Sequence, residues 1–229
     1  PPGTEHYGRS LLGAPLIWFP APAASRESGL ILAGTHGDEN SSVVTLSCAL
    51  RTLTPSLRRH HVVLCVNPDG CQLGLRANAN GVDLNRNFPA ANWKEGETVY
   101  RWNSAAEERD VVLLTGDKPG SEPETQALCQ LIHRIQPAWV VSFHDPLACI
   151  EDPRHSELGE WLAQAFELPL VTSVGYETPG YFGSWCADLN LHCITAEFPP
   201  ISSDEASEKY LFAMANLLRW HPKDAIRPS

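Results

Sequence analysis

Long apolar runs are absent from this chain of 229 residues. A membrane-spanning helix needs roughly 18 consecutive apolar residues, and no segment approaches that length. The N-terminal residues also show no basic region followed by an apolar one, which is the pattern of a secretory signal. We therefore expect a cytoplasmic protein without a membrane partner. Because the sequence begins at Pro1 rather than at methionine, we expect its true start to lie upstream.

Basic residues are scarce relative to acidic ones. The chain carries 17 lysines and arginines against 27 aspartates and glutamates, a formal net charge of −10. Such a charge opposes non-specific attraction to nucleic acid and to anionic membranes. We expect neither as a partner, and an acidic substrate would need a locally positive pocket.

Paired cysteine motifs are also missing. The chain has seven cysteines, an odd number, and none forms a C-x-x-C pair. This distribution favours reduced thiols in the cytosol over a disulfide framework or a cysteine-ligated zinc. Cys65 and Cys193 lie inside apolar runs, where a cysteine usually packs as a small hydrophobic residue.

Internal repeats, low-complexity tracts and coiled-coil heptads are not found either. With 43% hydrophobic residues, the length suits one domain over residues 1–229 with a substantial core. The oligomeric state stays open between monomer and homodimer.

Strand-like and helix-like segments alternate along the chain. Apolar runs of the kind buried on both faces predict strands at about 15–19, 29–34, 61–67, 138–143, 169–174 and 191–197. Helical patterns cover about 40–53, 121–136, 155–167 and 204–220, and Ser121 with Glu124 is typical of a capping box. Residues 89–120 have weak periodicity and are expected to form a surface excursion that walls a cleft. The pattern predicts a single-domain, three-layer α/β/α fold with a mixed, largely parallel sheet.

Polar residues with metal-binding side chains follow three of the predicted strands. His36 and Glu39 come after the run at 29–34, His144 follows 138–143, and Glu197 ends 191–197. In open α/β sheets, loops beyond the carboxyl ends of the strands gather into one site. Catalytic Zn²⁺ takes three nitrogen or oxygen ligands and leaves a fourth position for water. A histidine and a glutamate three residues apart are, taken alone, more typical of a solvated turn than of a metal site.

Neighbouring motifs strengthen the metal hypothesis. The segment Gly81-Val82-Asp83-Leu84-Asn85-Arg86-Asn87-Phe88-Pro89 follows Asn67-Pro68-Asp69-Gly70 and Arg76. With Thr35-His36-Gly37-Asp38-Glu39, His144 and Glu197, it closely resembles the zinc carboxypeptidase (M14) family over residues 29 to 200. The resemblance implies one zinc ion per chain and a metallopeptidase. Its implied reaction is hydrolysis of the γ-D-glutamyl–meso-diaminopimelate bond of murein tripeptide, a small peptide substrate.

The resemblance also implies a role for each motif residue. His36, Glu39 and His144 would bind zinc, and Glu197 would be the general base. Arg76 would stabilise the oxyanion, and Asn85 with Arg86 would clamp the substrate's terminal carboxylate. Tyr176 would hydrogen-bond the scissile amide. The loop before Glu197 contains a second tyrosine, Tyr181, but Tyr176 has the better spacing; a packed structural tyrosine is an equal alternative.

Elementary chemistry agrees with these roles. A planar guanidinium donates two parallel hydrogen bonds to a carboxylate, which suits Arg86. Losing one donor to a developing oxyanion typically costs about 3 to 4 kcal/mol, the task implied for Arg76. Glu197 must take a proton from water and return it to the leaving amine, so a raised pKa would suit it. Asp83 lies in a turn between apolar residues, where it is expected to cap backbone amides.

Several side chains keep alternative readings. Arg76 without its motif is typical of a surface loop, and His60 and His61, before a predicted strand, are expected to be exposed. Diaminopimelate carries a second amino-acid head, for which Glu177, Asp188 and Asp145 are candidate contacts.

Two other functions are compatible with part of this pattern. An aspartoacylase-like or succinylglutamate desuccinylase-like zinc enzyme, acting on a small acylated amino acid, shares the histidine and glutamate spacing and a later histidine. A non-catalytic binding module on the same fold would be favoured by the absence of Glu197, but the glutamate is present.

Overall fold

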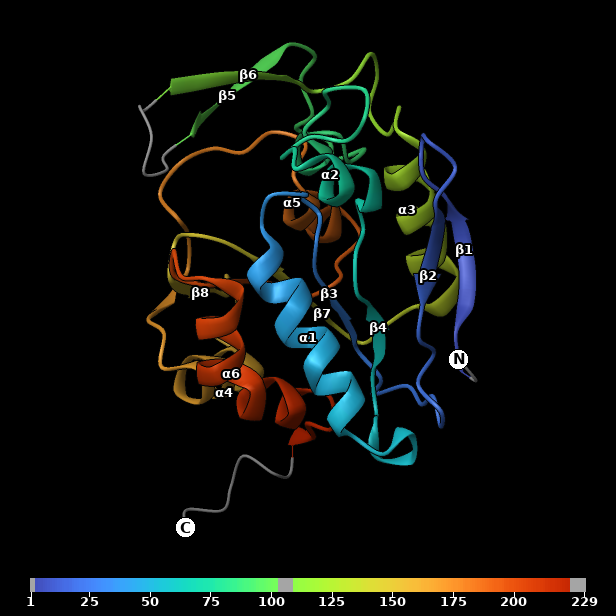
Figure 1. Cartoon of the computed structure of the whole chain (residues 1–229), viewed down its shortest axis with the longest axis vertical. Coiled ribbons are helices and arrows are strands. Elements are labelled where there is room, and N and C mark those ends of the chain that lie inside the picture. Colours follow the sequence, from blue (N-terminus) through green and yellow to red (C-terminus); the bar gives the residue numbers. More distant parts are fainter. Residues whose placement is uncertain (1–2, 103–108, 223–229) are drawn as a thin grey trace.

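Six strands form the central sheet of this computed structural model, which describes residues 3–102 and 109–222 (Figure 1). Their order across the sheet is β4 (His61–Val63), β3 (Leu30–Leu32), β7 (Val140–His144), β10 (Cys193–Glu197), β8 (Cys149–Glu151) and β9 (Leu170–Val171). The first four are mutually parallel, and β8 runs antiparallel to β10. The carboxyl ends of β3, β7 and β10 therefore meet at one edge, as the sequence predicts.

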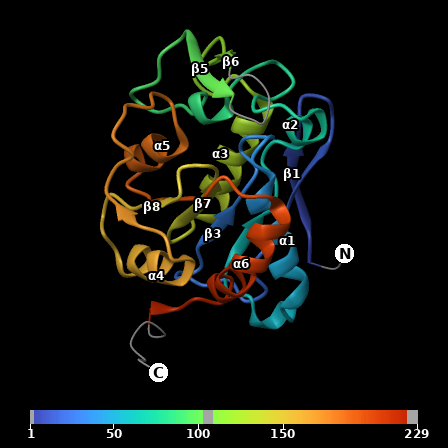
Figure 2. The ribbon, with the colours of Figure 1, turned by 60° about the vertical axis from the view of Figure 1, so that its left-hand side comes forward.

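Helices cover both faces of this sheet (Figures 1 and 2). On one face, α1 (Asn40–Thr52), α4 (Glu157–Phe166) and α6 (Ser203–Leu217) pack over alternate strand residues such as Ile31, Val141 and Ile194. On the other, α3 (Pro123–Ile135) and α5 (Phe182–Asp188) pack over Leu30 and Val140. Because both faces are buried, the strands need apolar residues at nearly every position. The predicted three-layer α/β/α fold with a mixed, largely parallel sheet is confirmed.

Two short sheets lie outside the central one. Strand β1 (Glu5–Arg9) pairs with β2 (Pro15–Trp18) beside α3, and β5 (Glu97–Trp102) pairs with β6 (Arg109–Leu114) as an antiparallel pair. The excursion predicted over 89–120 thus contains strands that the sequence pattern missed. Val99 and Val112 are exposed, whereas Leu113 on the inward side is buried and pairs with the polar Thr98. Because apolar residues stand on both sides of this pair, the sequence does not show the alternating pattern of a half-buried strand. Figure 1 shows the pair over the end of the molecule where α2 (Pro68–Leu73) lies.

The predicted capping box at Ser121 and Glu124 is wrong. Helix α3 begins at Pro123, and Ser121 instead donates a hydrogen bond to the Glu122 side chain (2.6 Å). Glu124 accepts hydrogen bonds from the backbone N–H of Leu11 and from Asn78. Among the helices within 3–102 and 109–222, none has both the length and the apolar character that crossing a bilayer requires.

Candidate metal centre

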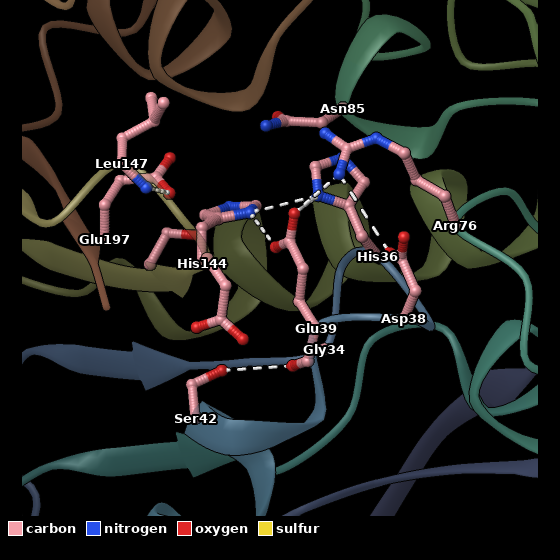
Figure 3. Close-up of polar contacts among 12 residues, drawn as sticks. Gly34, His36, Asp38, Glu39, Ser42, Arg76, Asn85, His144, Leu147 and Glu197 are labelled. Carbon is pink, nitrogen blue, oxygen red and sulfur yellow. Dashed lines mark hydrogen bonds and ion pairs between the residues drawn. The ribbon is translucent and has the colours of Figure 1, made fainter. Parts of the chain in front are cut away.

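Three ligand atoms converge where the carboxyl ends of β3 and β7 lie side by side. His36 is in the loop after β3, Glu39 directly precedes α1, and His144 is the last residue of β7. All three side chains are buried, and one ligand atom of each lies within 4.8 Å of the others. Figure 3 shows the two imidazoles and the carboxylate pointing toward one another.

The spacing of these atoms fits a tetrahedral zinc. His36 Nδ1 lies 2.8 Å from Glu39 Oε1, His144 Nδ1 lies 2.9 Å from Glu39 Oε2, and the two Nδ1 atoms are 3.2 Å apart. Ligands about 2.0–2.1 Å from zinc in a tetrahedron stand about 3.3 Å from one another. Two imidazoles and a carboxylate are also the donor set of known catalytic zinc sites. The three predicted ligands are therefore together and compatible with one zinc ion.

The outer nitrogen of each histidine has its own partner. His36 Nε2 is 3.1 Å from Asp83 Oδ1, and His144 Nε2 is 3.0 Å from the Ser142 hydroxyl. Such partners fix which ring nitrogen faces the metal and how the ring is oriented. Both histidines consequently present Nδ1 to the centre.

Asp83 and Ser142 were not predicted to take part in the site. Asp83 does accept the Asn85 backbone N–H, as expected (2.9 Å), but the same oxygen also contacts His36. Ser142 could have been found, because residues two apart on a strand share a face. The Asp83 contact joins residues 47 positions apart, and local sequence carries no signal for it.

Charges around the centre favour a cation there. Burial by itself and the Arg76 charge would lower the pKa of His36, but Glu39 and Asp83 raise it to about 9. Burial would likewise raise the pKa of Glu39, yet His36, Arg76 and His144 hold it well below its usual value. The Glu39 carboxylate is thus ionised at neutral pH, which is the state in which a carboxylate can bind metal.

Arg76 lies against the acidic side of the centre. Its Nη1 is 2.6 Å from Glu39 Oε1, and its Nε is 3.7 Å from Asp83 Oδ2. The guanidinium carbon stands 4.4 Å from the centroid of the Tyr100 ring, so the β5–β6 pair reaches the site. This contact supports the expectation that residues 89–120 wall the cleft. Burial alone would lower the pKa of Arg76, but these carboxylates outweigh it and raise the pKa above its usual value.

Asn85 and Arg86 occupy a single turn of 3₁₀ helix (Leu84–Arg86) next to the centre. The Asn85 side-chain oxygen accepts the Phe182 backbone N–H (3.0 Å), so its NH₂ group is the end that can donate to a ligand. Arg86 donates from Nη1 to the Asn85 carbonyl (2.8 Å) and stays partly exposed. Their position is consistent with the predicted clamp.

Glu197 stands directly beside His144, one of the three candidate zinc donors. It ends β10 in register with His144 on the parallel strand β7, and both side chains face the same side of the sheet. In the view of Figure 3, Glu197 and Arg76 flank the histidine pair from opposite sides. Burial, together with the Glu39 charge, raises the pKa of Glu197 although His144 lowers it.

The two candidate tyrosines differ in environment. Tyr176 is 56% exposed on the loop between β9 and α5, yet the Glu197, Arg86 and Arg76 charges all act on it. Burial and the Glu197 charge raise its pKa. Tyr181 is half-buried, directly precedes α5, and packs where a Cβ at Gly183 would overlap its ring. Tyr176 is the tyrosine on an exposed loop, as the predicted role requires.

Known proteins resemble this chain over most of its length. The profile of the zinc carboxypeptidase family (Peptidase_M14) matches residues 4–146. Murein peptide amidase A of Vibrio campbellii is 56% identical over 94% of this chain and 87% of its own length. The crystal structure of murein-tripeptide amidase MpaA from Escherichia coli O157 is 98% identical, with a TM-score of 0.93, and the alignment covers 98% of this chain and 94% of that one.

A more distant structure shares the fold alone. Carboxypeptidase A from Helicoverpa armigera has a TM-score of 0.68 at 17% identity, and the alignment covers 97% of this chain and 66% of that one. The family profile and the 56% identical relative, taken with three converging zinc donors, agree on one assignment. The chain belongs to the zinc carboxypeptidase family and is a zinc-dependent peptidase.

Proposed function

We propose that this chain hydrolyses the γ-D-glutamyl–meso-diaminopimelate bond of murein tripeptide, L-Ala-γ-D-Glu-meso-diaminopimelate. The observation that carries this most directly is the pairing of the His36, Glu39 and His144 donor set with a buried acid, Glu197, in the adjacent strand. Similarity to two proteins named as murein peptide and murein-tripeptide amidases supports the substrate class. Family membership favours a peptidase over the alternative enzyme on small acylated amino acids.

We assign the zinc to His36, Glu39 and His144. When bound, zinc supplies an electrophile that polarises the scissile carbonyl and lowers the pKa of a water molecule. Glu197 accepts one proton from the attacking water while the oxygen adds to the carbonyl carbon. The same carboxyl then gives that proton to the departing amine as the C–N bond breaks. The raised pKa of Glu197 suits both transfers, because the group must bind and release a proton near neutrality.

The remaining predicted residues bind and orient the peptide. Arg76 provides a fixed positive charge for the negative charge that develops on the carbonyl oxygen. Asn85 and Arg86 hold the terminal carboxylate, the first through its free NH₂ end and the second through its planar fork. Tyr176 donates a hydrogen bond to the scissile amide from its exposed loop.

We further propose one catalytic domain over residues 1–229, acting in the cytoplasm as a monomer or homodimer. Both core clusters use residues of the same sheet, which supports a single folding unit. The seven cysteines are free thiols, which supports a reducing compartment.

The test is hydrolysis of L-Ala-γ-D-Glu-meso-diaminopimelate beside α-linked peptides of the same length, with and without a chelator. We expect cleavage of the γ-linked tripeptide, little cleavage of the α-linked ones, and loss of both on chelation, restored by zinc. Activity that survives complete chelation would contradict the metal mechanism. Equal turnover of α-linked peptides would contradict the murein substrate while leaving the peptidase intact.

A further inference from the structure

Two cysteines, Cys65 and Cys71, lie in contact with each other and have no role in the steps above. Their Sγ atoms are 3.3 Å apart, and both residues are partly exposed. A disulfide bond is about 2.05 Å long, so the two sulfurs need to approach by only roughly 1 Å to be joined. A close pair of thiols that solvent can reach is a candidate site for reversible oxidation.

The turn between β4 and α2 brings the two thiols together. Cys65 follows β4, and the Asn67 side chain caps α2 by accepting the Gly70 backbone N–H (2.9 Å). The Asn67 carbonyl accepts the Cys71 backbone N–H (3.1 Å), which closes the first turn of the helix. Asn67 is fully buried and also donates to the Ala77 carbonyl (3.1 Å), so contacts on both sides hold this turn in place.

The two thiols differ in acidity. The Cys65 thiol donates a hydrogen bond that lowers the pKa of Cys71, although burial and the Asp38 charge act to raise it. Burial raises the pKa of Cys129 to about 12 and that of Cys149 to about 11. Peroxides react with thiolates rather than with thiols. Cys71 is therefore the member of the pair suited to attack a peroxide, and Cys65 is the neighbouring thiol that can react next.

The thiol pair packs against the loop that carries the first proposed zinc ligand. Cys65 Sγ lies 3.9 Å from the Gly34 carbonyl oxygen, and a Cβ at Gly34 would stand 3.1 Å from the same sulfur. A Cβ at Gly37 would overlap the backbone nitrogen of Cys71. His36 lies between these two glycines, and Figure 1 shows α2 beside the loop that joins β3 to α1. Because the contact leaves no spare volume, a displacement of the cysteines is passed to this loop.

We propose that Cys65 and Cys71 form a reversible oxidation site for hydroperoxides, and that their disulfide displaces the His36 loop and lowers the affinity for zinc. The inference goes beyond the proposed function, because it concerns control of the metal centre and not the bond that is cut. Zinc sites keep their ligand distances within about 0.2 Å. The approach of the two sulfurs, roughly 1 Å, exceeds that tolerance several times.

The oxidation proceeds in two balanced steps. The Cys71 thiolate attacks one oxygen of hydrogen peroxide, the O–O bond breaks, and the hydroxide that leaves takes up a proton to become water. The product is a sulfenic acid on Cys71. The Cys65 thiol then attacks this sulfur, the S–O bond breaks, the S–S bond forms and a second water leaves. The two sulfurs together lose two electrons, which the peroxide gains. Cellular thiols reverse the reaction by exchange through a mixed disulfide.

The experiment treats reduced, zinc-loaded protein with a few equivalents of hydrogen peroxide and then removes the peroxide. Trypsin releases one peptide, from His60 to Arg76, that contains both cysteines. We expect this peptide to lose two hydrogens by mass, and two of the seven thiols to disappear from a thiol titration. Zinc affinity, measured by competition with a chromophoric chelator, should fall about tenfold, as when the partner of a ligand is disturbed. Dithiothreitol should reverse all three changes.

Three variants identify the reacting groups. Cys71→Ser and Cys65→Ser should each keep their zinc affinity through the peroxide treatment, because neither can form the disulfide. Cys65→Ser should also retain a sulfenic acid on Cys71, which dimedone traps. Cys48→Ser is the matched control, since Cys48 is also partly exposed but lies on α1, beside Arg51. It should respond to peroxide as the wild type does.

Three results would overturn the inference. The first is a peptide from His60 to Arg76 that keeps both thiols after the treatment. The second is a disulfide that forms in this peptide while zinc affinity stays constant. The third is an equal loss of zinc affinity in Cys71→Ser, which would place the sensitive group elsewhere. Because the peptide mass and the zinc affinity are both measured on the wild type, the inference stays testable if a variant does not fold.

Discussion

Two pairs of buried histidines lie at opposite ends of the strands of one sheet, and the groups around them differ in charge. His36 and His144 lie at the carboxyl ends, where carboxylates raise the pKa of His36 to about 9. His60 and His61 lie at the amino-terminal end of β4, where burial lowers the pKa of each to about 4. Burial acts in the same direction at both ends, so the neighbouring groups decide the result.

The partners of the second pair are backbone groups. His60 accepts the Gly29 N–H (3.1 Å) and its other ring nitrogen is 2.9 Å from the Trp220 carbonyl. His61 accepts the Ala21 N–H (3.0 Å). These contacts satisfy neutral imidazoles and offer no anion, although a cavity of about 650 Å³ lies beside His60. Buried histidines and a large cavity therefore do not make a metal centre; converging carboxylates do.

Removing a proposed zinc ligand should have the largest effect on zinc content and activity, and it should distinguish the two pairs of histidines. In His36→Ala we expect zinc content to fall from one per chain to none and hydrolysis to fall to background, because two donors rarely hold catalytic zinc. His60→Gln, the control from the other pair, should keep its zinc and its activity. Metal analysis of the purified proteins measures this, and full zinc content in His36→Ala would refute the ligand assignment.

Glu197→Gln should separate catalysis from metal binding at the carboxyl ends of the strands. The amide keeps the size of the side chain but cannot accept the proton, so we expect kcat to fall by about 10²- to 10⁴-fold. Zinc content should stay at one per chain. If zinc is lost with the activity, Glu197 is a ligand and the assigned roles are wrong.

The sequence predicts the surroundings of a histidine only where the contacts that determine them are local. His36, Glu39, His144 and Glu197 could be placed because each follows an apolar strand, and parallel strands end at a common edge. The burial of His60 and His61 was predicted wrongly: both were expected to be exposed. Distant residues cover them: the Trp139 ring and the Trp220 backbone carbonyl contact His60, and the Trp18 ring contacts His61. No local sequence pattern predicts these contacts.

The same reasoning explains what was found and missed in the fold. Strands of the central sheet with continuous apolar runs were predicted, but β8, three residues long, and the exposed β5–β6 pair were not. A three-residue strand is too short to show a period, and in the β5–β6 pair exposed valines and an inward-facing threonine hide the alternation. Asp83 was placed correctly as a cap and missed as the partner of His36, since one carboxylate oxygen serves both.

Asp83→Asn should weaken the metal centre without removing it. The amide can still contact His36 Nε2, but it no longer contributes the negative charge that makes the ring a better ligand. Loss of such a partner typically costs about 10- to 100-fold in metal affinity. Competition with a chromophoric chelator measures the change. Unaltered zinc affinity in a folded variant would show that the Asp83 contact does not tune the site.

The smallest expected effect is on the pH dependence of folding stability, and it should come from His60, next to the amino-terminal end of β4. The folded-state pKa of His60 is depressed to about 4 against about 6.5 unfolded, so only the unfolded chain gains a proton between these values. Its contribution is complete above pH 6.5 and is lost as pH falls toward 4. The full shift corresponds to about 3 kcal/mol, which we reduce to about 1–2 kcal/mol for solvent screening.

The measurement is urea unfolding of zinc-free wild-type and His60→Gln protein at pH 6.5, 5.5 and 4.5. The difference between the two proteins is needed because burial raises the pKa of Asp145 to about 7, and protonation of that group stabilises the fold over the same range. We expect the variant to be less stable at pH 6.5 and the gap to narrow as pH falls. If the free energies of unfolding of the two proteins change in parallel with pH, His60 is not held neutral in the folded state. The two pairs of histidines would then differ in their contacts but not in their pKa values.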